Sequence, residues 1–184
     1  MDGRLDDEPW SRAVPVSDFL QMGDKTAPPE ETSVRVMYDR DAFFFGVEAK
    51  VEHGWGKLLA EQTVRDGDVY ADDSIEFFVY APNGEYYQVV VNTLGTIYDA
   101  RGFDKTFDCQ ATAAVQVDED RYTIELRFPV APMGVPEIEP GAAWRLHVSR
   151  NCMNLQPPQT AVGISLDGVS PHDIGNYRYA EMEQ

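Results

Sequence analysis

Apolar and polar residues alternate along most of the chain, which is the pattern of strands that bury one face and expose the other. Turn-forming residues separate the runs, as in Asp39-Arg40-Asp41 and Pro82-Asn83-Gly84. The predicted strands cover residues 34–38, 43–51, 75–79, 87–91, 97–98, 111–117, 122–128, 144–148 and 177–179. Many short strands and no long helical period predict an all-β fold. We expect an antiparallel β-sandwich, immunoglobulin-like or jelly-roll-like, with two packed sheets and short helical turns in the loops.

Two segments rich in proline, glycine, aspartate and glutamine interrupt this pattern. They cover residues 18–32 and 153–172 and are predicted to be loops, and a single helical turn is expected at 58–61. A length of 184 residues fits one domain with a sizeable core, so 1–184 is expected to be a single sandwich. It is expected to act as a monomer or as a module of a multidomain chain.

The charge of the chain limits its partners. There are 15 basic and 32 acidic residues, which gives a net charge of −17. A polyanion would be repelled, so we expect no nucleic-acid partner and no binding to anionic membranes. Neutral ligands and cations remain open, and solubility alone is the competing explanation of the acidity.

Targeting and redox signals are few. No segment is apolar over a length that spans a membrane, and residues 1–8 lack the basic start and apolar run of a signal peptide. Cys109 and Cys152 leave two alternatives open, one disulfide or two free thiols.

Polar side chains share the faces opposite the apolar ones on several predicted strands. If these strands lie in one sheet, one surface carries a carboxylate, two amides, an imidazole and a guanidinium group, with an aromatic ring at its rim. These candidate ligand-binding residues are Glu76, Gln88, Asn92, His147, Arg150 just past the regular alternation of its strand and, at the rim, Tyr70. Such groups pair with sugar hydroxyls, and aromatic rings stack on the C–H face of a sugar. A solvated outer sheet face is the alternative interpretation.

Acidic residues in the turns suggest calcium. The candidate ligands are Asp6, Asp39, Asp41 and Asp66, although none lies in a recognisable calcium loop. Solvated turn carboxylates are the alternative.

An enzymatic role is less well supported. The carboxylates of Asp72, Asp73 and Glu76 are clustered, and glycosidases use pairs of carboxylates. Acids at strand ends are more often turn caps or calcium ligands, and no hydrolase or phosphate-loop motif is present. We therefore expect no catalysis by this chain alone. A haem-binding sandwich is a further alternative, but no histidine and methionine spacing supports it.

Short motifs follow one another in a fixed order along the chain. They are Asp2-Gly3-Arg4-Leu5-Asp6-Asp7-Glu8-Pro9-Trp10, Asp72-Asp73-Ser74-Ile75-Glu76-Phe77-Phe78, Tyr87-Gln88-Val89-Val90-Val91-Asn92, Trp144-Arg145-Leu146-His147-Val148-Ser149-Arg150-Asn151 and Gly175-Asn176-Tyr177. In this order they resemble the family 9 carbohydrate-binding modules over nearly the full length of the chain.

The resemblance implies a non-catalytic β-sandwich that binds saccharides, such as the ends of plant polysaccharides or oligosaccharides. Such modules target secreted polysaccharide-degrading enzymes, so an extracellular, periplasmic or cell-surface location is implied, often with structural calcium. Tyr70 falls where one of two aromatics clamps the terminal sugar, and Glu76 falls on the sugar-binding carboxylate.

The chain also departs from the family pattern. Val90 stands where a sugar-binding arginine is expected, and His147 where a glutamine is expected. The second clamp aromatic would lie in residues 168–173, which contain no phenylalanine, tyrosine or tryptophan. Trp55 is a candidate substitute, or else a core residue. The alternative function is therefore a degenerate, structural or protein-interaction sandwich without a sugar site.

Overall fold

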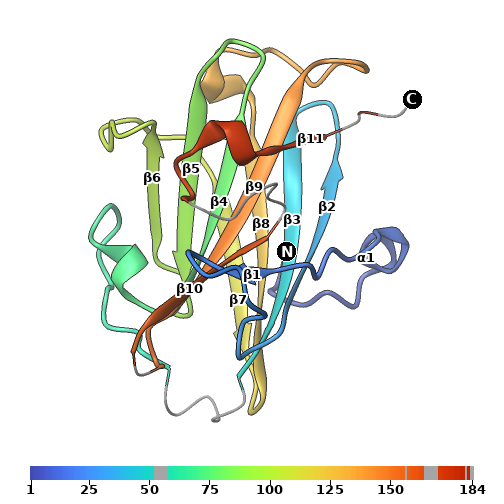
Figure 1. Ribbon diagram of the computed structural model, residues 1–184. Helices are drawn as coiled ribbons and strands as arrows, with labels where there is room; N and C mark the ends of the chain where they lie inside the picture. Colours follow the sequence, from blue (N-terminus) through green and yellow to red (C-terminus); the bar gives the residue numbers. More distant parts are fainter. Residues whose placement is uncertain (52–57, 156, 164–169, 181, 183–184) are drawn as a thin grey trace.

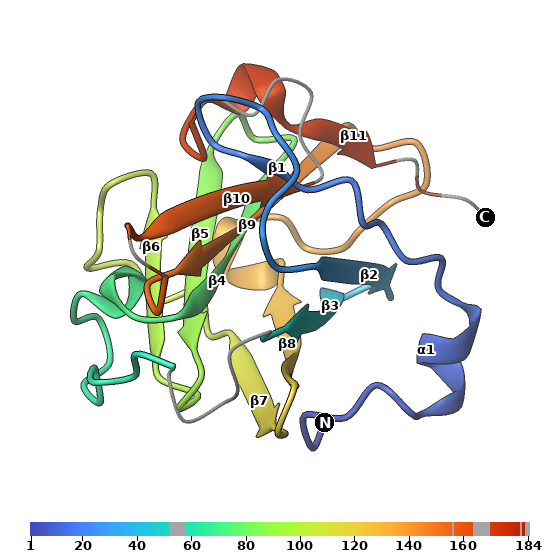
Figure 2. The same ribbon diagram turned by 60° about the horizontal axis from the view of Figure 1, so that its bottom comes forward.

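The protein is a sandwich of two antiparallel sheets, as the alternating pattern predicts (Figures 1 and 2). The computed structural model describes residues 1–51, 58–155, 157–163, 170–180 and 182. Within these residues, no helix has the length and apolar character needed to cross a bilayer.

The larger sheet has the order β1-β10-β9-β4-β5-β6, with β11 also paired to β9. Its strands are β1 (Leu20–Gln21), β4 (Ser74–Tyr80), β5 (Tyr86–Asn92), β6 (Ile97–Arg101), β9 (Trp144–Cys152), β10 (Gln159–Gly163) and β11 (Arg178–Ala180). One edge of β9 pairs with β4 along most of its length. The other edge is shared, because β11 pairs with its first residues and β10 with its last.

The smaller sheet has the order β2-β3-β8-β7. Its strands are β2 (Thr32–Tyr38), β3 (Ala42–Lys50), β7 (Thr112–Val117) and β8 (Arg121–Pro129). The helical segments are a five-residue α1 (Glu8–Arg12) and the 3₁₀ turns η2 (Val69–Ala71), η3 (Ala131–Met133) and η4 (Ile174–Asn176). The predicted short helical turns therefore exist, although they lie at other positions than residues 58–61.

The core lies between the two sheets and is rich in aromatic rings. Phe43 of β3 meets Trp144 of β9 edge to face at 5.1 Å, and Phe45 meets Phe77 of β4 at 5.2 Å. Every second residue of each central strand is buried in this cluster, as the alternation predicts. The opposite face of β4, β5 and β9 is consequently free to carry polar groups.

A buried carboxylate anchors the N-terminal segment to the smaller sheet. Glu125 of β8 accepts hydrogen bonds from the main-chain N–H groups of Asp2 and Gly3, at 2.7 and 2.9 Å, and from Trp10 Nε1 at 2.8 Å. Trp10 in turn lies over Gly46 of β3. Through these contacts Asp2, Gly3 and Trp10 hold the N-terminal segment against the smaller sheet.

Two predictions about loops are wrong. Residues 18–32 and 153–172 contain β1 and β10, which pair with each other at the edge of the larger sheet. β1 has only two residues, too few for alternation to reveal a strand. Only its pairing with β10 identifies it as one. Residues 58–61 form no helical turn.

The two cysteines are buried free thiols. The thiol of Cys109 donates a hydrogen bond of 2.8 Å to the Asp99 carboxylate. Burial raises the pKa of Cys152 to about 11. Of the two alternatives, a disulfide or two free thiols, the structure has the two free thiols.

Candidate functional site

The outer face of the larger sheet carries a buried carboxylate held by two amides. Glu76 is the central residue of this cluster and only 6% exposed. Its Oε2 accepts a hydrogen bond of 2.6 Å from Gln88 Nε2 on β5, and its Oε1 accepts one of 2.9 Å from Asn151 Nδ2 on β9. The three side chains reach each other because β5 and β9 flank β4 and all three point away from the core. Burial raises the pKa of Glu76, and the hydrogen bonds donated by the Asn151 and Gln88 side chains oppose this shift.

A pocket of about 370 Å³ opens above this cluster. Aromatic side chains dominate its walls, and polar groups lie at the sheet. It is lined by Tyr70, Glu76, Gln88, Tyr98, Phe103, Asn151, Met153, Pro171 and His172. A largely apolar cavity with a few convergent polar groups is the usual form of a small-ligand site.

One aromatic pair in this pocket is Tyr70 and Tyr98. Tyr70 lies on η2 and is 44% exposed, and its ring meets that of Tyr98 edge to face at 6.0 Å. The Tyr70 hydroxyl donates a hydrogen bond of 2.9 Å to the carboxylate of Asp68, which raises the pKa of Tyr70. Tyr70 thus has an oriented, partly exposed ring, as a stacking residue needs.

A second aromatic pair comes from two other loops. Phe103 follows β6 and is 79% exposed, and it packs against the imidazole of His172 at 4.9 Å and 31°. His172 Nδ1 lies 3.1 Å from the Tyr86 hydroxyl, and burial lowers the pKa of His172. Of the residues expected to carry the second clamp aromatic, His172 therefore contributes an imidazole, and the loop after β6 contributes the phenyl ring. Sequence reasoning missed Phe103, although an aromatic residue between Gly102 and Asp104 in a turn is an available signal.

Two consecutive aspartates fix the loops around this pocket. Asp73 accepts hydrogen bonds from the main-chain N–H groups of Leu59, at 2.6 Å, and of Met153 and Asn154, at 3.0 and 3.3 Å. Asp72 accepts from two further N–H groups of residues 61–62. Both carboxylates are buried and engaged in anchoring loops, which argues against a glycosidase pair at this strand end.

Two predicted residues lie on the expected face but outside the pocket lining. The Asn92 side chain donates to Asp72 and to the carbonyl of Gln62, each at 2.8 Å, and so holds a loop. His147 is fully buried and stacks on Tyr177 with ring centroids 5.1 Å apart. Trp55 lies outside the described residues.

The expectation that Arg150 shares the face of Glu76 is wrong. Arg150 pairs in register with the core residue Ile75 and points between the sheets. It bonds the Glu30 carboxylate at 2.6 Å and Thr32 Oγ1 at 3.0 Å, and its guanidinium lies 5.4 Å from the centre of the Tyr122 ring. Regular alternation assigns Arg150 to the interior. Its burial is tolerable because Glu30, which is far away in the sequence, supplies the counter-ion.

The structure gives hydrogen-bonding or ion-pair partners to the aspartates predicted as calcium ligands. Asp39 accepts hydrogen bonds from the N–H groups of Asp41 and Ala42 and caps the turn between β2 and β3. Asp66 accepts from the N–H of Asp99 and lies near Arg65, while Asp6 lies near Arg4. Within the described ranges, no three histidine, cysteine or acidic side chains gather as metal ligands. Calcium binding stays a prediction.

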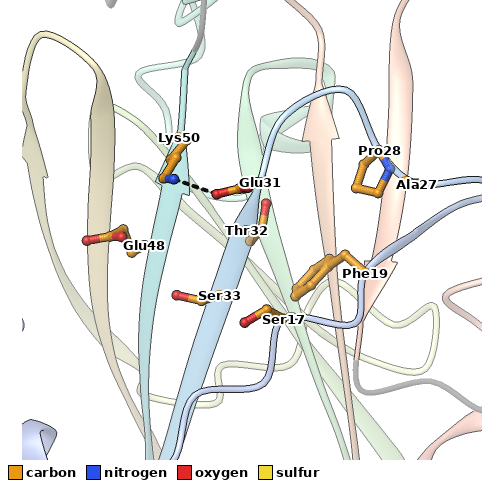
Figure 3. A pocket seen from close by; sticks show the side chains of 9 residues that line it. All are labelled: Ser17, Phe19, Ala27, Pro28, Glu31, Thr32, Ser33, Glu48 and Lys50. Atoms are coloured by element: carbon orange, nitrogen blue, oxygen red, sulfur yellow. Dashed lines mark hydrogen bonds and ion pairs between the residues drawn. The ribbon is translucent and has the colours of Figure 1, made fainter.

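A larger hollow of about 510 Å³ is lined by residues of β2 and β3 and of the segment 17–28 (Figure 3). Glu31 and Lys50 point toward one another across its rim and form an ion pair, and Glu48 pairs with Arg121. These exposed charges already form ion pairs with each other. The hollow therefore presents fewer unused polar groups to a ligand than the pocket above Glu76 does.

Comparison with known proteins relates the chain to one family. The profile described as carbohydrate family 9 binding domain-like matches residues 1–151. A protein from Bacteroides uniformis proposed to bind carbohydrate has a TM-score of 0.66 at 15% identity, covering 89% of this chain and 85% of that chain.

Two solved structures of a family 9 carbohydrate-binding module from Caldicellulosiruptor kristjanssonii also share the fold. The complex with glucose has a TM-score of 0.64 at 14% identity, covering 91% of this chain and 81% of that chain. The complex with cellotriose has a TM-score of 0.64 at 13% identity, covering 96% and 83%. A search of curated proteins finds no significant match.

Proposed function

Because the chain belongs to the carbohydrate family 9 binding domain-like family, we propose that it binds a saccharide in the pocket above Glu76. The observation that carries this proposal is the cluster of Glu76, Gln88 and Asn151 at the sheet, with aromatic rings around it. In this proposal Glu76 accepts hydrogen bonds from sugar hydroxyls, and the two amides hold its carboxylate in place.

The aromatic pairs supply the apolar part of the site. Tyr70 stacks on one sugar ring, and Phe103 with His172 takes the role expected of a second clamp residue. Asp73 holds the segment at Met153, which lines the pocket, against the start of β4, so this wall needs little ordering on binding.

The wider role follows the family. We propose a non-catalytic module that directs a polysaccharide-degrading system outside the cytoplasm to its substrate. The relatives solved with glucose and cellotriose favour a glucose-containing ligand as the first to test. The competing function is a structural or protein-interaction sandwich without sugar binding.

Calorimetric titration with glucose, cellotriose, xylotriose and mannotriose tests the proposal. Tyr70→Ala and Phe103→Ala are each expected to weaken binding by about tenfold or more, because each removes a stacking ring. Tyr179→Ala is the matched control, since Tyr179 is 64% exposed on β11 and lies outside the pocket. A panel without any binding would favour the structural sandwich. Wild-type affinity in both Tyr70→Ala and Phe103→Ala would place the site elsewhere, and equal losses in all three variants would show that the losses do not come from stacking.

A further inference from the structure

We propose that this pocket selects a sugar that carries a protonated amine, such as a 2-amino sugar, over the corresponding neutral sugar. The inference rests on the proposed saccharide binding and adds the chemical class of the ligand. It follows from the charge balance around Glu76 and from the kind of side chains that face the pocket.

The carboxylate of Glu76 has neutral neighbours within the sheet. Across the β4–β5 pair it faces Val90, and across the β4–β9 pair it faces Ser149. Its hydrogen-bond donors are the neutral amides of Gln88 and Asn151, which satisfy one site on each oxygen and leave further acceptor capacity. No lysine or arginine belongs to the described lining of the pocket. A buried carboxylate in such a site gains most from a ligand that brings the positive charge.

The rest of the surroundings adds negative potential. The Tyr70 hydroxyl bonds the Asp68 carboxylate at the pocket. Burial raises the pKa of Tyr98, and nearby carboxylates, Glu76 and Asp68 among them, raise it further. Arg65 pairs with two of the others, Asp99 at 2.7 Å and Asp66 at 3.8 Å, so the negative potential comes chiefly from Glu76 and Asp68. The pKa of Glu76 is raised chiefly by burial, so a bound ammonium would favour its ionised form.

The pocket walls also suit a cation. Tyr70, Tyr98 and Phe103 line it, and aromatic faces attract an ammonium group through their quadrupoles. A carboxylate together with several aromatic rings binds a protonated amine through two complementary interactions. A neutral sugar uses the rings and a hydroxyl–carboxylate bond, but it leaves the charge of Glu76 uncompensated.

The test compares glucosamine and galactosamine with glucose, galactose and the two N-acetylated sugars, by calorimetry at a pH where the amines are protonated. The wild type is expected to bind an amino sugar about tenfold more tightly than its neutral parent, because hydrogen bonds between charged groups are stronger than neutral ones. The N-acetyl form keeps the nitrogen and loses the charge, so it should not bind more tightly than the neutral parent sugar. This comparison changes only the ligand and leaves the protein as it is.

Two variants assign the preference to its residue. Glu76→Gln is expected to bring the affinity ratio of amino to neutral sugar close to one. Glu119→Gln is the control with the same loss of charge, because Glu119 is exposed in the turn between β7 and β8 of the other sheet. It should leave the ratio unchanged.

The outcomes separate this inference from the proposed function. Neutral and amino sugars bound equally well by the wild type would overturn the amine preference and leave saccharide binding standing. A preference that survives in Glu76→Gln would also overturn it. No binding of any sugar would overturn both. Tighter binding of the amino sugars that only Glu76→Gln abolishes would support it.

Discussion

Replacing Arg150 by methionine separates a structural role from a ligand-binding role. Arg150 is fully buried, and its guanidinium donates to the Glu30 carboxylate at 2.6 Å, to a threonine hydroxyl at 3.0 Å and to two main-chain carbonyl oxygens at 3.2 and 2.8 Å. Methionine fills much of the same volume but offers none of these donors. The variant therefore leaves a buried carboxylate without this counter-ion.

The expected cost follows from the loss of this buried ion pair. Removing one partner of a buried ion pair costs about 3–5 kcal/mol of unfolding free energy. For a chain of this length, such a loss lowers the melting temperature by roughly 6–20 °C. The double variant Glu30→Gln with Arg150→Met is expected to recover part of this lost stability, because it also removes the charge of the Glu30 carboxylate.

Urea denaturation measures the unfolding free energies, and calorimetry measures sugar binding in the same variants. Arg150→Met should keep the sugar affinity of the wild type wherever it remains folded, because Arg150 points between the sheets. An unfolding free energy within about 1 kcal/mol of the wild type would refute the energetic argument. Normal stability with lost sugar binding would refute the placement of Arg150.

Three further predictions concern packing, loop anchoring and pH. Gly46→Ala should lower the unfolding free energy in urea by about 1–3 kcal/mol, because the added methyl would lie 2.8 Å from Leu5 and 2.9 Å from Trp10; an unchanged midpoint would contradict this packing. Asp73→Ala removes the acceptor of three main-chain N–H groups and should cost about 2–4 kcal/mol and weaken sugar binding, which unfolding and titration together check; wild-type affinity would show that the loops need no anchor. Burial raises the pKa of Glu76 above its unfolded value of about 4.3, so unfolding free energy should fall as pH rises from there through the folded-state pKa. Glu76→Gln should show a shallower fall, and identical slopes would remove Glu76 from this titration.

The sequence alone predicted most of the sandwich, because alternation is a local signal. The central strands β3, β4, β5, β8 and β9 each bury every second residue, so their existence and their buried faces could be read without knowing their partners. The edge strand β1 and its neighbour β10 were missed, since their definition depends on pairing between segments about 140 residues apart.

The sequence predicts only part of the candidate site. Glu76 and Gln88 follow from alternation, and Tyr70 from its place beside the strand. Phe103 and His172 were missed because loops far apart in sequence meet only in the folded chain. Arg150 was placed on the wrong face although regular alternation assigns it to the interior, because the counter-ion that makes its burial tolerable, Glu30, lies 120 residues away in the sequence.

The loop that carries Phe103 has a consequence for how this fold can diversify. Its shape is fixed by Asp104, whose carboxylate accepts hydrogen bonds from the N–H and hydroxyl of Thr106 at 3.1 and 2.6 Å, while the Phe103 ring projects into solvent. Residue 103 can therefore change identity without disturbing the core or the loop. Selection, natural or in a laboratory library, can retune what the protein recognises at this position without first having to restore stability lost elsewhere.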